Sequence, residues 1–485
     1  MHKSLLLLTI YFTILSGLAQ DSIPIQPDLE SYYDEIEQLF DLPAFPGAWG
    51  AGMYATGGRG GEILLVTNLN DAGPGSLRSA VEASGPRIII FKVGGTIKLE
   101  SDLVIENPDI TIAGQTAPGK GIALRGAKLN ISGDNTIVRY LRVRRGDENL
   151  TFDDGIAVSD AENVIVDHCT ISWTTDEAIN TWHGAKNVTF QWCIVAEALN
   201  NSVHEKGEHG YGASLGGENT SYHHNLLAHH TARNPSIAGN ADERTHNLDW
   251  RNNLVYNWEY RTLDGKPDEI NVINNYYKPG PVTQLMERLV RIDDRSGYGL
   301  PAGRWYVSGN VLETRKSNDN WKDLVKAEGD MNPNEYKLEE PIEVAPVWTQ
   351  PAKEIVAPIL RFAGVTVPGR DTWEHRIVEE VRTGTAYFGE NGIIDSQKDV
   401  GGWPELKTAE PVSDGDSDGI PDWWEELYGL NPEDPSDAGQ DMNQSGYTNI
   451  EEYLNGTNPK IEIDYTIPVN NKNPLHKFPN LLLPH

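Results

Sequence analysis

The sequence is poor in cysteine and in positive charge. Only 2 of its 485 residues are cysteines, too few for a disulfide framework in a protein of this length. Lysine and arginine together number 40, against 71 aspartates and glutamates, so the formal net charge is −31. Binding to nucleic acid needs a basic face for the phosphates, and this balance of charges provides none. We therefore expect no nucleic-acid partner. Two explanations of the excess of acidic residues remain, solubility and the binding of cations.

Long apolar runs are lacking beyond the N-terminus. No stretch after residue 20 approaches the roughly 18 apolar residues that a membrane-spanning helix needs. Before it, Lys3 precedes the apolar run Leu5–Leu15, and the small residues Gly17 and Ala19 follow. This is the pattern of a signal peptide, which we place at residues 1–19. The sequence thus predicts a secreted protein, extracellular or periplasmic, that does not span a membrane.

Short β-rich segments recur through the middle of the chain. Apolar residues alternate within each segment, as in strands, and the joints carry Gly, Asn and Asp rather than helical patterns. One aligned position recurs at steps of 22 to 35 residues, at Leu141, Cys169, Cys193, Asn225, Asn253, Asn275 and Asn310. A repeat of this length built from strands predicts an all-β protein, a parallel β-solenoid whose coils bury their apolar side chains on one another.

Stacking of equivalent positions leads to two specific predictions. Asn225, Asn253 and Asn275 should form a ladder in which each side-chain amide bonds to the next coil. Cys169 and Cys193 should lie one coil apart, with strands ~4.8 Å from one another, either as two buried thiols or as a disulfide. The sequence leaves both states of the cysteines open.

The segments that flank the repeats differ from them in composition. Residues 45–61 are Gly-rich and irregular, and a helix expected at Ser76–Ala83 would cap the open end of the solenoid. Residues 316–412 are charged and punctuated by proline, with a helix expected at Trp373–Arg382 and a polar linker near 407–413.

One group of polar residues is a candidate cation site, and it consists of Asp153, Asp154, Asp176, Glu177 and Asn180. Asp154 and Asp176 are 22 residues apart, close to one coil, so their carboxylates can lie side by side. Ca²⁺ needs several carboxylate or carbonyl oxygens, more than one residue supplies. The alternative is that these residues are solvated acids of turns, where Asp and Asn are common.

Four motifs, FPGAWGAG, VIVDHCTISW, HEKGEHGYG and HHTARNPS, resemble in kind and in order those of the pectate lyase superfamily, polysaccharide lyase family 1, in its secreted bacterial form. The resemblance covers roughly residues 40–315, which we take as the lyase domain. It implies a right-handed single-stranded parallel β-helix and dependence on Ca²⁺. It also implies cleavage of α-1,4-linked polygalacturonan, the backbone of pectin, by β-elimination to give 4,5-unsaturated oligogalacturonates.

The resemblance implies roles for single residues as well. Asp154, Asp176 and Asn180 fall at the calcium-ligand positions of the family. Arg233 falls at the position of the catalytic base, and Lys206 at that of a lysine that contacts the substrate carboxylate. Elimination across C5–C4 of a uronate requires a base at C5 and neutralisation of the carboxylate beside it. Because the pKa of arginine lies above ~12, such a base needs other cations nearby and an acidified proton.

Two positions depart from the family pattern. Asn180 stands where the family usually has an acid, which lowers the expected charge of the calcium site. Ala238 stands where the family often has a second arginine, so we expect another residue, with Arg244 as the candidate, to help hold the substrate. These departures keep open a non-catalytic β-helix that binds polyuronate or acts as an adhesin. Within enzymes, the alternative is a pectin lyase that acts on methylated substrate without calcium in the cleft.

Two segments near the C-terminus match the twelve-residue calcium loop of the EF-hand type. They are DGDSDGIPDWWE, Asp414–Glu425, and DMNQSGYTNIEE, Asp441–Glu452, which start 27 residues apart and share a Gly at position 6. The pair resembles the calcium repeats of dockerin-like and thrombospondin type 3-like modules, which implies a small helical calcium-loop module at 413–458 and a tail at 459–485. The implied ligands are Asp414, Asp416, Asp418, Ile420, Asp422 and Glu425 in the first loop and Asp441, Asn443, Ser445, Tyr447, Asn449 and Glu452 in the second. The sequence names no protein partner for this module, and a pair of acidic turns without metal is the alternative.

Overall fold

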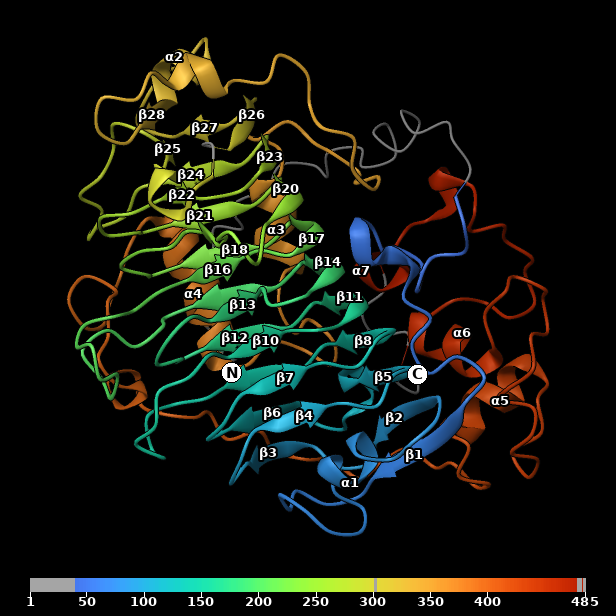
Figure 1. Cartoon of the computed structure of the whole chain (residues 1–485). Coiled ribbons are helices and arrows are strands. Elements are labelled where there is room, and N and C mark those ends of the chain that lie inside the picture. Colours follow the sequence, from blue (N-terminus) through green and yellow to red (C-terminus); the bar gives the residue numbers. More distant parts are fainter. Residues whose placement is uncertain (1–39, 301–302, 478–481, 483–485) are drawn as a thin grey trace, which may run out of the picture.

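The structure is a computed structural model that describes residues 40–300, 303–477 and 482. The predicted signal peptide and part of the tail lie outside the described residues. The strands form three sheets that are parallel throughout, and the chain visits the three sheets in turn (Figure 1). In the described part of the chain, no helix is long and apolar enough to cross a bilayer.

Each complete coil contributes one strand to each sheet. Sheet A consists of β1 (Glu62–Val66), β2 (Arg87–Phe91), β5 (Ile110–Ala113), β8 (Thr136–Arg139), β11 (Glu162–Asp167), β14 (Lys186–Gln191), β17 (Glu218–His223), β20 (His246–Arg251), β23 (Glu269–Ile273) and β26 (Arg304–Ser308). Sheet B consists of β3 (Gly95–Lys98), β6 (Ile122–Arg125), β9 (Arg142–Arg144), β12 (Thr170–Ser172), β15 (Ile194–Ala196), β18 (Leu226–Ala228), β21 (Leu254–Tyr256), β24 (Tyr276–Lys278) and β27 (Val311–Leu312). Sheet C consists of β4 (Leu103–Ile105), β7 (Leu129–Ile131), β10 (Ile156–Val158), β13 (Ile179–Thr181), β16 (Ala213–Leu215), β19 (Ser236–Ile237), β22 (Leu263–Gly265), β25 (Val290–Ile292) and β28 (Val325–Ala327). This arrangement fits the predicted right-handed parallel β-helix, the hand that crossovers between parallel strands almost always take.

The core lies inside the stack of coils and consists of rows of apolar side chains. In sheet A, the paired positions of four successive strands hold Val166, Phe190, Tyr222 and Trp250, all buried. Strands direct alternate side chains inward, so the period of two within each segment and the repeat between coils together produce a continuous core. Removal of this apolar surface from water is the main term that favours the fold.

The predicted asparagine ladder is confirmed. Asn225 Nδ2 donates to Asn253 Oδ1 over 3.1 Å, and Asn253 Nδ2 donates to Asn275 Oδ1 over 3.1 Å. The ladder continues to the next coil, where Asn275 Nδ2 donates to Asn310 Oδ1 over 2.9 Å. Each accepting Oδ1 also receives the backbone N–H of the asparagine one coil before it. All four side chains are buried, so the ladder pairs polar groups that water cannot reach.

The two cysteines are free thiols. Cys169 and Cys193 are both buried in the core, and no disulfide joins them. Burial raises the pKa of the Cys193 thiol. Of the two states that the sequence left open, the structure has the buried thiols.

Short helices lie at both ends of the stack. α1 (Leu77–Val81) begins after Ser76, whose hydroxyl accepts a backbone N–H of the first turn. The sequence predicted this helix as Ser76–Ala83, and it ends two residues earlier. α2 (Asn320–Leu324), which the sequence pattern did not reveal, lies at the opposite end and buries Trp321 in the core.

Two helices of the Pro-punctuated segment cover the outer face of sheet B. α3 (Val356–Phe362) and α4 (Thr372–Thr383) bury apolar side chains against β15, β18 and β21. The helix predicted at Trp373–Arg382 is therefore confirmed as α4, which a capping box of Asp371 and Glu374 begins.

Buried ion pairs fasten α4 to sheet B. Arg142 Nη2 lies 2.9 Å from Glu374 Oε2, and Arg144 Nη1 lies 2.6 Å from Asp371 Oδ2. Both arginines come from β9, and all four side chains are at most 5% exposed. Removing one partner of such a pair would leave a buried charge unpaired, so the pairs tie the two segments together.

The C-terminal segment covers the outer face of the first strands of sheet A. It contains α5 (Asp422–Tyr428), α6 (Asn449–Asn455) and α7 (Pro474–Lys477), and α5 and α6 lie beside β1, β2 and β5 (Figure 1). The contact is an apolar cluster that includes Ile88, Ile90, Ala113, Ile420, Trp424 and Ile450. Short 3-10 helices of the described residues are η2 (Ala51–Tyr54), η3 (Gly114–Thr116), η4 (Ser296–Tyr298), η5 (Pro333–Tyr336), η6 (Gln397–Val400) and η7 (Pro468–Asn470).

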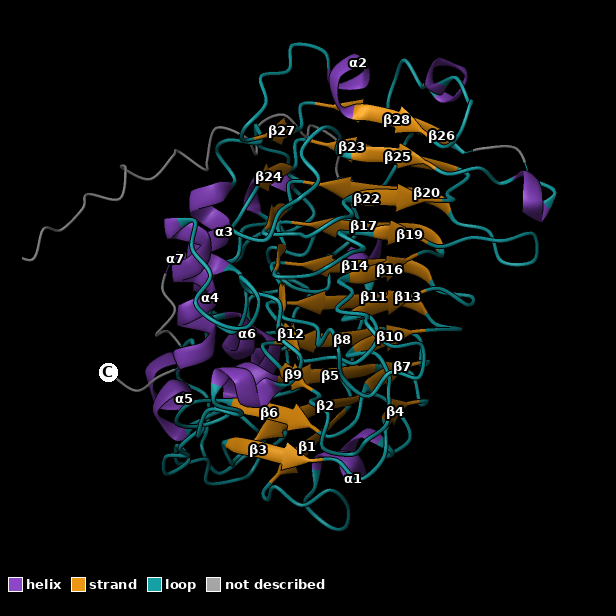
Figure 2. Ribbon diagram, turned by 90° about the vertical axis from the view of Figure 1, so that its left-hand side faces the viewer, coloured by secondary structure: helices purple, strands orange, loops and turns teal. Residues whose placement is uncertain are grey.

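Sheet C keeps a polar outer face. Its outward row, in register across the strands, reads Asn130, Ala157, Asn180, Ser214, Ser236, Asp264 and Arg291. Figure 2 shows α3 to α7 on one side of the molecule and the strands of sheet C on the other. Since helices pack on sheets A and B, sheet C is the face that a polar ligand can approach.

Replacing the middle rung of the ladder tests its contribution to stability. Asn253→Ala leaves the Asn225 and Asn275 amides each without one buried partner, so we expect the free energy of unfolding to fall by about 2 to 3 kcal/mol. The matched control, Asn318→Ala at an exposed asparagine, should change it by less than about 0.5 kcal/mol. Denaturant unfolding of both variants measures the difference, and equal stability of the two would contradict a structural ladder.

Candidate active site

Charged residues gather where the strands of sheet C begin. Asp154 lies two residues before β10, Asp176 lies three residues before β13, and Arg233 lies three residues before β19. Because these strands stack side by side, the loops that enter them on successive coils bring together residues that are distant in sequence.

Three carboxylates form the acidic part of this site. Oxygens of Asp154, Asp176 and Glu177 lie within 4.8 Å of one another. Asp154 is 8% exposed, and its Oδ1 has no hydrogen-bond partner. Burial, together with the neighbouring charge of Asp176, raises the pKa of Asp154 to about 7. Buried like charges at this separation are unfavourable unless a cation joins them, and oxygen ligands of this kind suit Ca²⁺.

Asn180 and Asp153 take different places around the carboxylates. Asn180 Nδ2 donates to Asp154 Oδ2 over 3.1 Å. Asp153 turns to Lys128 instead, with its Oδ1 2.9 Å from Lys128 Nζ. The structure thus brings Asp154, Asp176 and Asn180 together, adds Glu177 to them, and engages Asp153 in an ion pair.

Arg233 faces the same carboxylates. Its Nη1 forms an ion pair with Glu177, and its Cζ lies 4.5 Å from the centroid of the Tyr211 ring. The side chain is 30% exposed, so Arg233 is partly open to solvent. Burial and then the charge of Arg261 lower the pKa of Arg233. A lowered pKa is the direction that a general base requires.

Arg261 is a functional candidate that the sequence reasoning missed. It follows Arg233 by 28 residues, the same step that separates Asn225 from Asn253, so the repeat spacing carried the signal. Its guanidinium forms a two-pronged ion pair with Asp264 in β22, with N–O distances of 2.8 and 2.7 Å. A second arginine therefore lies one coil beyond Arg233 on the same face.

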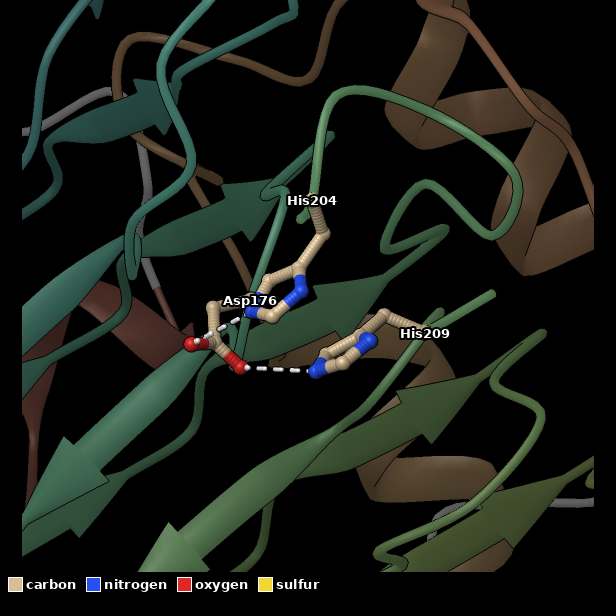
Figure 3. Close-up of side chains that lie close together, drawn as sticks. All are labelled: Asp176, His204 and His209. Atoms are coloured by element: carbon tan, nitrogen blue, oxygen red, sulfur yellow. Dashed lines mark ion pairs between the residues drawn. The ribbon is translucent and has the colours of Figure 1, made fainter. Parts of the chain in front are cut away.

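Two histidines lie beside Asp176 (Figure 3). His204 Nε2 lies 3.4 Å from Asp176 Oδ2, and His209 Nε2 lies 3.6 Å from Oδ1. Their rings are stacked, with centroids 3.4 Å apart and planes inclined by 18°. Lone pairs in two nearly parallel ring planes do not converge on one ion. This pair is therefore better suited to orienting the carboxylate than to binding a metal with it.

Lys206 lies between these histidines in the loop that joins β15 to β16. Its backbone N–H donates to His204 Nδ1 over 3.1 Å, and its side chain is exposed. Since His204 and His209 lie against Asp176, this loop brings Lys206 close to the acidic site in the chain path.

Arg244 is engaged elsewhere. Its Nε lies 2.7 Å from Asp268 Oδ2, and the same carboxylate also pairs with His246 and Arg295. Asp268 immediately precedes β23 of sheet A. The structure places Arg244 on this second cluster because the loop that carries it runs towards sheet A, and Arg261 is the arginine beside Arg233.

The two predicted calcium loops lie on sheet A. In the first, carboxylate oxygens of Asp414, Asp416 and Asp418 lie within 4.8 Å of one another. Asp422 turns back to the start of the loop and accepts the Gly415 N–H over 2.7 Å. A carboxylate oxygen of Glu425 also lies within 4.8 Å of one of Asp418. The first loop thus gathers four of its predicted ligands, and a fifth, Asp422, closes its own backbone.

Neutral donors meet the acidic groups of the second loop. Glu452 accepts hydrogen bonds from Asn443 Nδ2 (3.0 Å), from Ser445 Oγ (2.6 Å) and from Thr457 Oγ1. Asp441 Oδ1 accepts the Ser445 N–H over 3.1 Å. The predicted ligands Ile420, Glu425, Tyr447 and Asn449 are buried.

The sequence has clear relatives, although no family model matches it. Probable pectate lyase C of Aspergillus terreus is 34% identical over 431 residues, which covers 86% of this chain and 94% of that protein. Probable pectate lyase C of Aspergillus fumigatus is 34% identical over 428 residues, with the same coverage of both chains. Among solved structures, a pectate lyase from Bacillus sp. N165 in complex with trigalacturonate is 19% identical to this chain, with a TM-score of 0.43. The match covers 66% of this chain and 99% of that chain, and it is too distant to add to the family assignment.

Identity at a third of the positions over most of both chains indicates common descent, and it agrees with the motifs of the sequence. The chain belongs to the pectate lyase family and is a polysaccharide lyase.

Proposed function

We propose that the protein is a secreted, calcium-dependent pectate lyase that cleaves α-1,4-polygalacturonan by β-elimination and releases 4,5-unsaturated oligogalacturonates. The observation that carries the proposal is the approach of Arg233 to the Asp154, Asp176 and Glu177 carboxylates on the open face of sheet C. Family membership supports the reaction class, and the pattern at residues 1–19 supports secretion.

The carboxylates fit Ca²⁺ because buried oxygens among them lack hydrogen-bond donors. Asp154 Oδ1 is buried without a donor, while the Asp176 side chain is 26% exposed, so an ion there can meet both protein and substrate. Asp154, Asp176 and Glu177 would hold the ion, with Asn180 as a neutral neighbour. When bound, Ca²⁺ neutralises a substrate carboxylate and so acidifies the proton at C5.

Arg233 is the residue that we assign to the C5 proton. In its neutral form the guanidine accepts this proton, the C5–H electron pair becomes the C4=C5 double bond, and the C4–O bond to the next sugar breaks. The leaving oxygen takes a proton from water. Burial and the neighbouring Arg261 lower the pKa of Arg233, and the Glu177 carboxylate fixes the orientation of its guanidinium.

The grip on the polymer is assigned to Arg261 and Lys206. Arg261 lies one coil beyond Arg233, where the next uronate of an extended chain would pass, and Lys206 extends from the loop tethered to Asp176. Arg244 lies in the Asp268 cluster instead of beside Arg233, so we assign this role to Arg261. A pectin lyase would meet uncharged methyl esters and need no cation, so the buried carboxylates favour an unmethylated substrate.

Incubation with polygalacturonate, with Ca²⁺ and with a chelator, tests the proposed reaction. We expect ultraviolet absorbance of the C4=C5 product to rise with calcium and to stop rising on chelation. Reducing ends without absorbance would mean hydrolysis, and turnover of methylated pectin alone without calcium would mean a pectin lyase. Binding of the polymer with no product would mean a non-catalytic polyuronate binder.

Arg233→Lys tests the base. Lysine keeps the positive charge but not the geometry of the guanidinium, so we expect kcat to fall by at least about 100-fold while the Kd for polygalacturonate changes little. Arg304→Lys, at an exposed arginine of sheet A, is the matched control. Turnover of Arg233→Lys at the level of the control would remove Arg233 from the base role.

Arg261→Ala tests the grip on the substrate. Loss of a charge-assisted hydrogen bond is worth about 1.5 to 3 kcal/mol, so we expect KM for polygalacturonate to rise roughly 10- to 100-fold. Arg304→Ala should leave KM unchanged, and thermal unfolding checks that both variants are folded. A raised KM in Arg244→Ala with none in Arg261→Ala would return the role to Arg244.

A further inference from the structure

A residue beyond the twelve-residue pattern completes the first calcium loop. Carboxylate oxygens of Asp418, Glu425 and Asp437 lie within 4.8 Å of one another. Asp418 also belongs to the group that it forms with Asp414 and Asp416, so the two groups overlap at this residue. Asp437 lies 12 residues after Glu425, beyond the end of α5. One of its oxygens accepts a backbone N–H of the turn that follows the helix, which holds this turn against the loop.

Several oxygens of these buried carboxylates have no hydrogen-bond donor. Glu425 is 0% exposed, and neither of its oxygens has a hydrogen-bond partner. Asp418 is 3% exposed, and one oxygen each of Asp416, Asp418 and Asp437 also lacks a partner. Burial, and then the charge of Asp418, raises the pKa of Glu425 to about 8. Unpaired buried carboxylates are strongly unfavourable, and a hard divalent cation with oxygen ligands relieves them.

The buried glutamate of the second loop is satisfied without a cation. Glu452, at the position equivalent to Glu425, already accepts hydrogen bonds from Asn443, Ser445 and Thr457. Three neutral donors meet its charge, so the case for an ion concerns the first loop alone.

The first loop is also the surface through which the C-terminal segment meets the β-helix. A Cβ on Gly419, its sixth residue, would lie 3.1 Å from Ile90 of β2, and Ile420 beside it is fully buried. Asp414 Oδ2 lies 2.6 Å from Nζ of Lys92, the residue after β2. The turn that would wrap a cation is therefore the turn that rests on sheet A.

The helix of the second loop faces the β-helix as well. All residues of α6, Asn449–Asn455, are buried. Glu451 pairs with Arg59 over 2.8 Å, and Asn455 Oδ1 accepts from Arg139 over 2.9 Å. The chain thus covers this helix with its own β-helix, which leaves little of it open to a second protein.

We propose that Asp416, Asp418, Glu425 and Asp437 bind a calcium ion that fastens residues 413–458 to sheet A, so that the protein needs calcium for stability as well as in the cleft. The ion would hold the loop turn that places Ile420 on the sheet and draw the turn after α5 onto the loop. This site is separate from sheet C, and the inference does not depend on the reaction that the cleft performs.

Thermal unfolding of the full chain in an Asp154→Asn background tests the proposal, because that substitution weakens the cleft site. Addition of CaCl₂ after chelation should raise Tm by about 5 °C in Asp154→Asn and in the control Asp154→Asn/Glu426→Gln. Glu426 is the exposed neighbour of Glu425 on α5 and receives the same change. In Asp154→Asn/Glu425→Gln the rise should disappear, although Tm in chelator should be equal or higher, since a buried charge is gone. An undiminished rise in the Glu425→Gln variant would overturn the proposal.

Limited proteolysis of the unmodified chain gives a second readout that needs no variant. The exposed linker at 407–413 joins the C-terminal segment to the rest of the chain. Chelation should speed cleavage there by at least about fivefold and release the segment, and CaCl₂ should reverse this. Cleavage at the same rate with and without calcium would contradict a calcium-fastened segment, even if the lyase assay showed full calcium dependence.

Discussion

Register between coils is the constraint on which the rest of the structure depends. Main-chain hydrogen bonds join each strand to its equivalent one coil on, ~4.8 Å away, so a side chain at one position lies beside its equivalents along the whole stack. The buried row of Val166, Phe190, Tyr222 and Trp250 follows from this register, and so does the asparagine ladder. The same register carries Asp154, Asp176, Arg233 and Arg261 onto one face, because their loops enter β10, β13, β19 and β22 of sheet C.

The later parts of the chain decide which face stays open. α3 and α4 cover sheet B, with buried ion pairs from Arg142 and Arg144, and the C-terminal segment covers sheet A. Sheet C then presents a row of polar and charged side chains along the stack, a shape that suits an extended polymer. An acidic protein gains no long-range attraction for a polyuronate, and the proposed grip is accordingly local, from a cation and a few arginines and lysines in one place.

Buried carboxylates without donors mark both candidate calcium sites, but the two differ in exposure. In the cleft, Asp176 is partly open, so an ion there can also contact substrate. In the first C-terminal loop, Glu425 and Asp418 are enclosed, so an ion there contacts protein alone and acts on folding. The second loop shows the contrasting solution, in which Asn443, Ser445 and Thr457 satisfy one glutamate by hydrogen bonds.

The sequence by itself determined the features that repeat or that are local. The spacing of the asparagines predicted the solenoid and its ladder, the periodicity at Trp373–Arg382 predicted α4, and the ordered motifs identified the family. Contacts between segments that are far apart in the chain were decided only by the tertiary structure. Arg261 rather than Arg244 lies beside Arg233, Asp437 joins the first calcium loop, and residues 413–458 rest on strands that begin at Glu62. The physical reason is twofold. Coil lengths vary from 22 to 35 residues, so the spacing determines which strands stack but not where the loops between them point. The docking of a distant segment depends on a surface that exists only once the coils have formed.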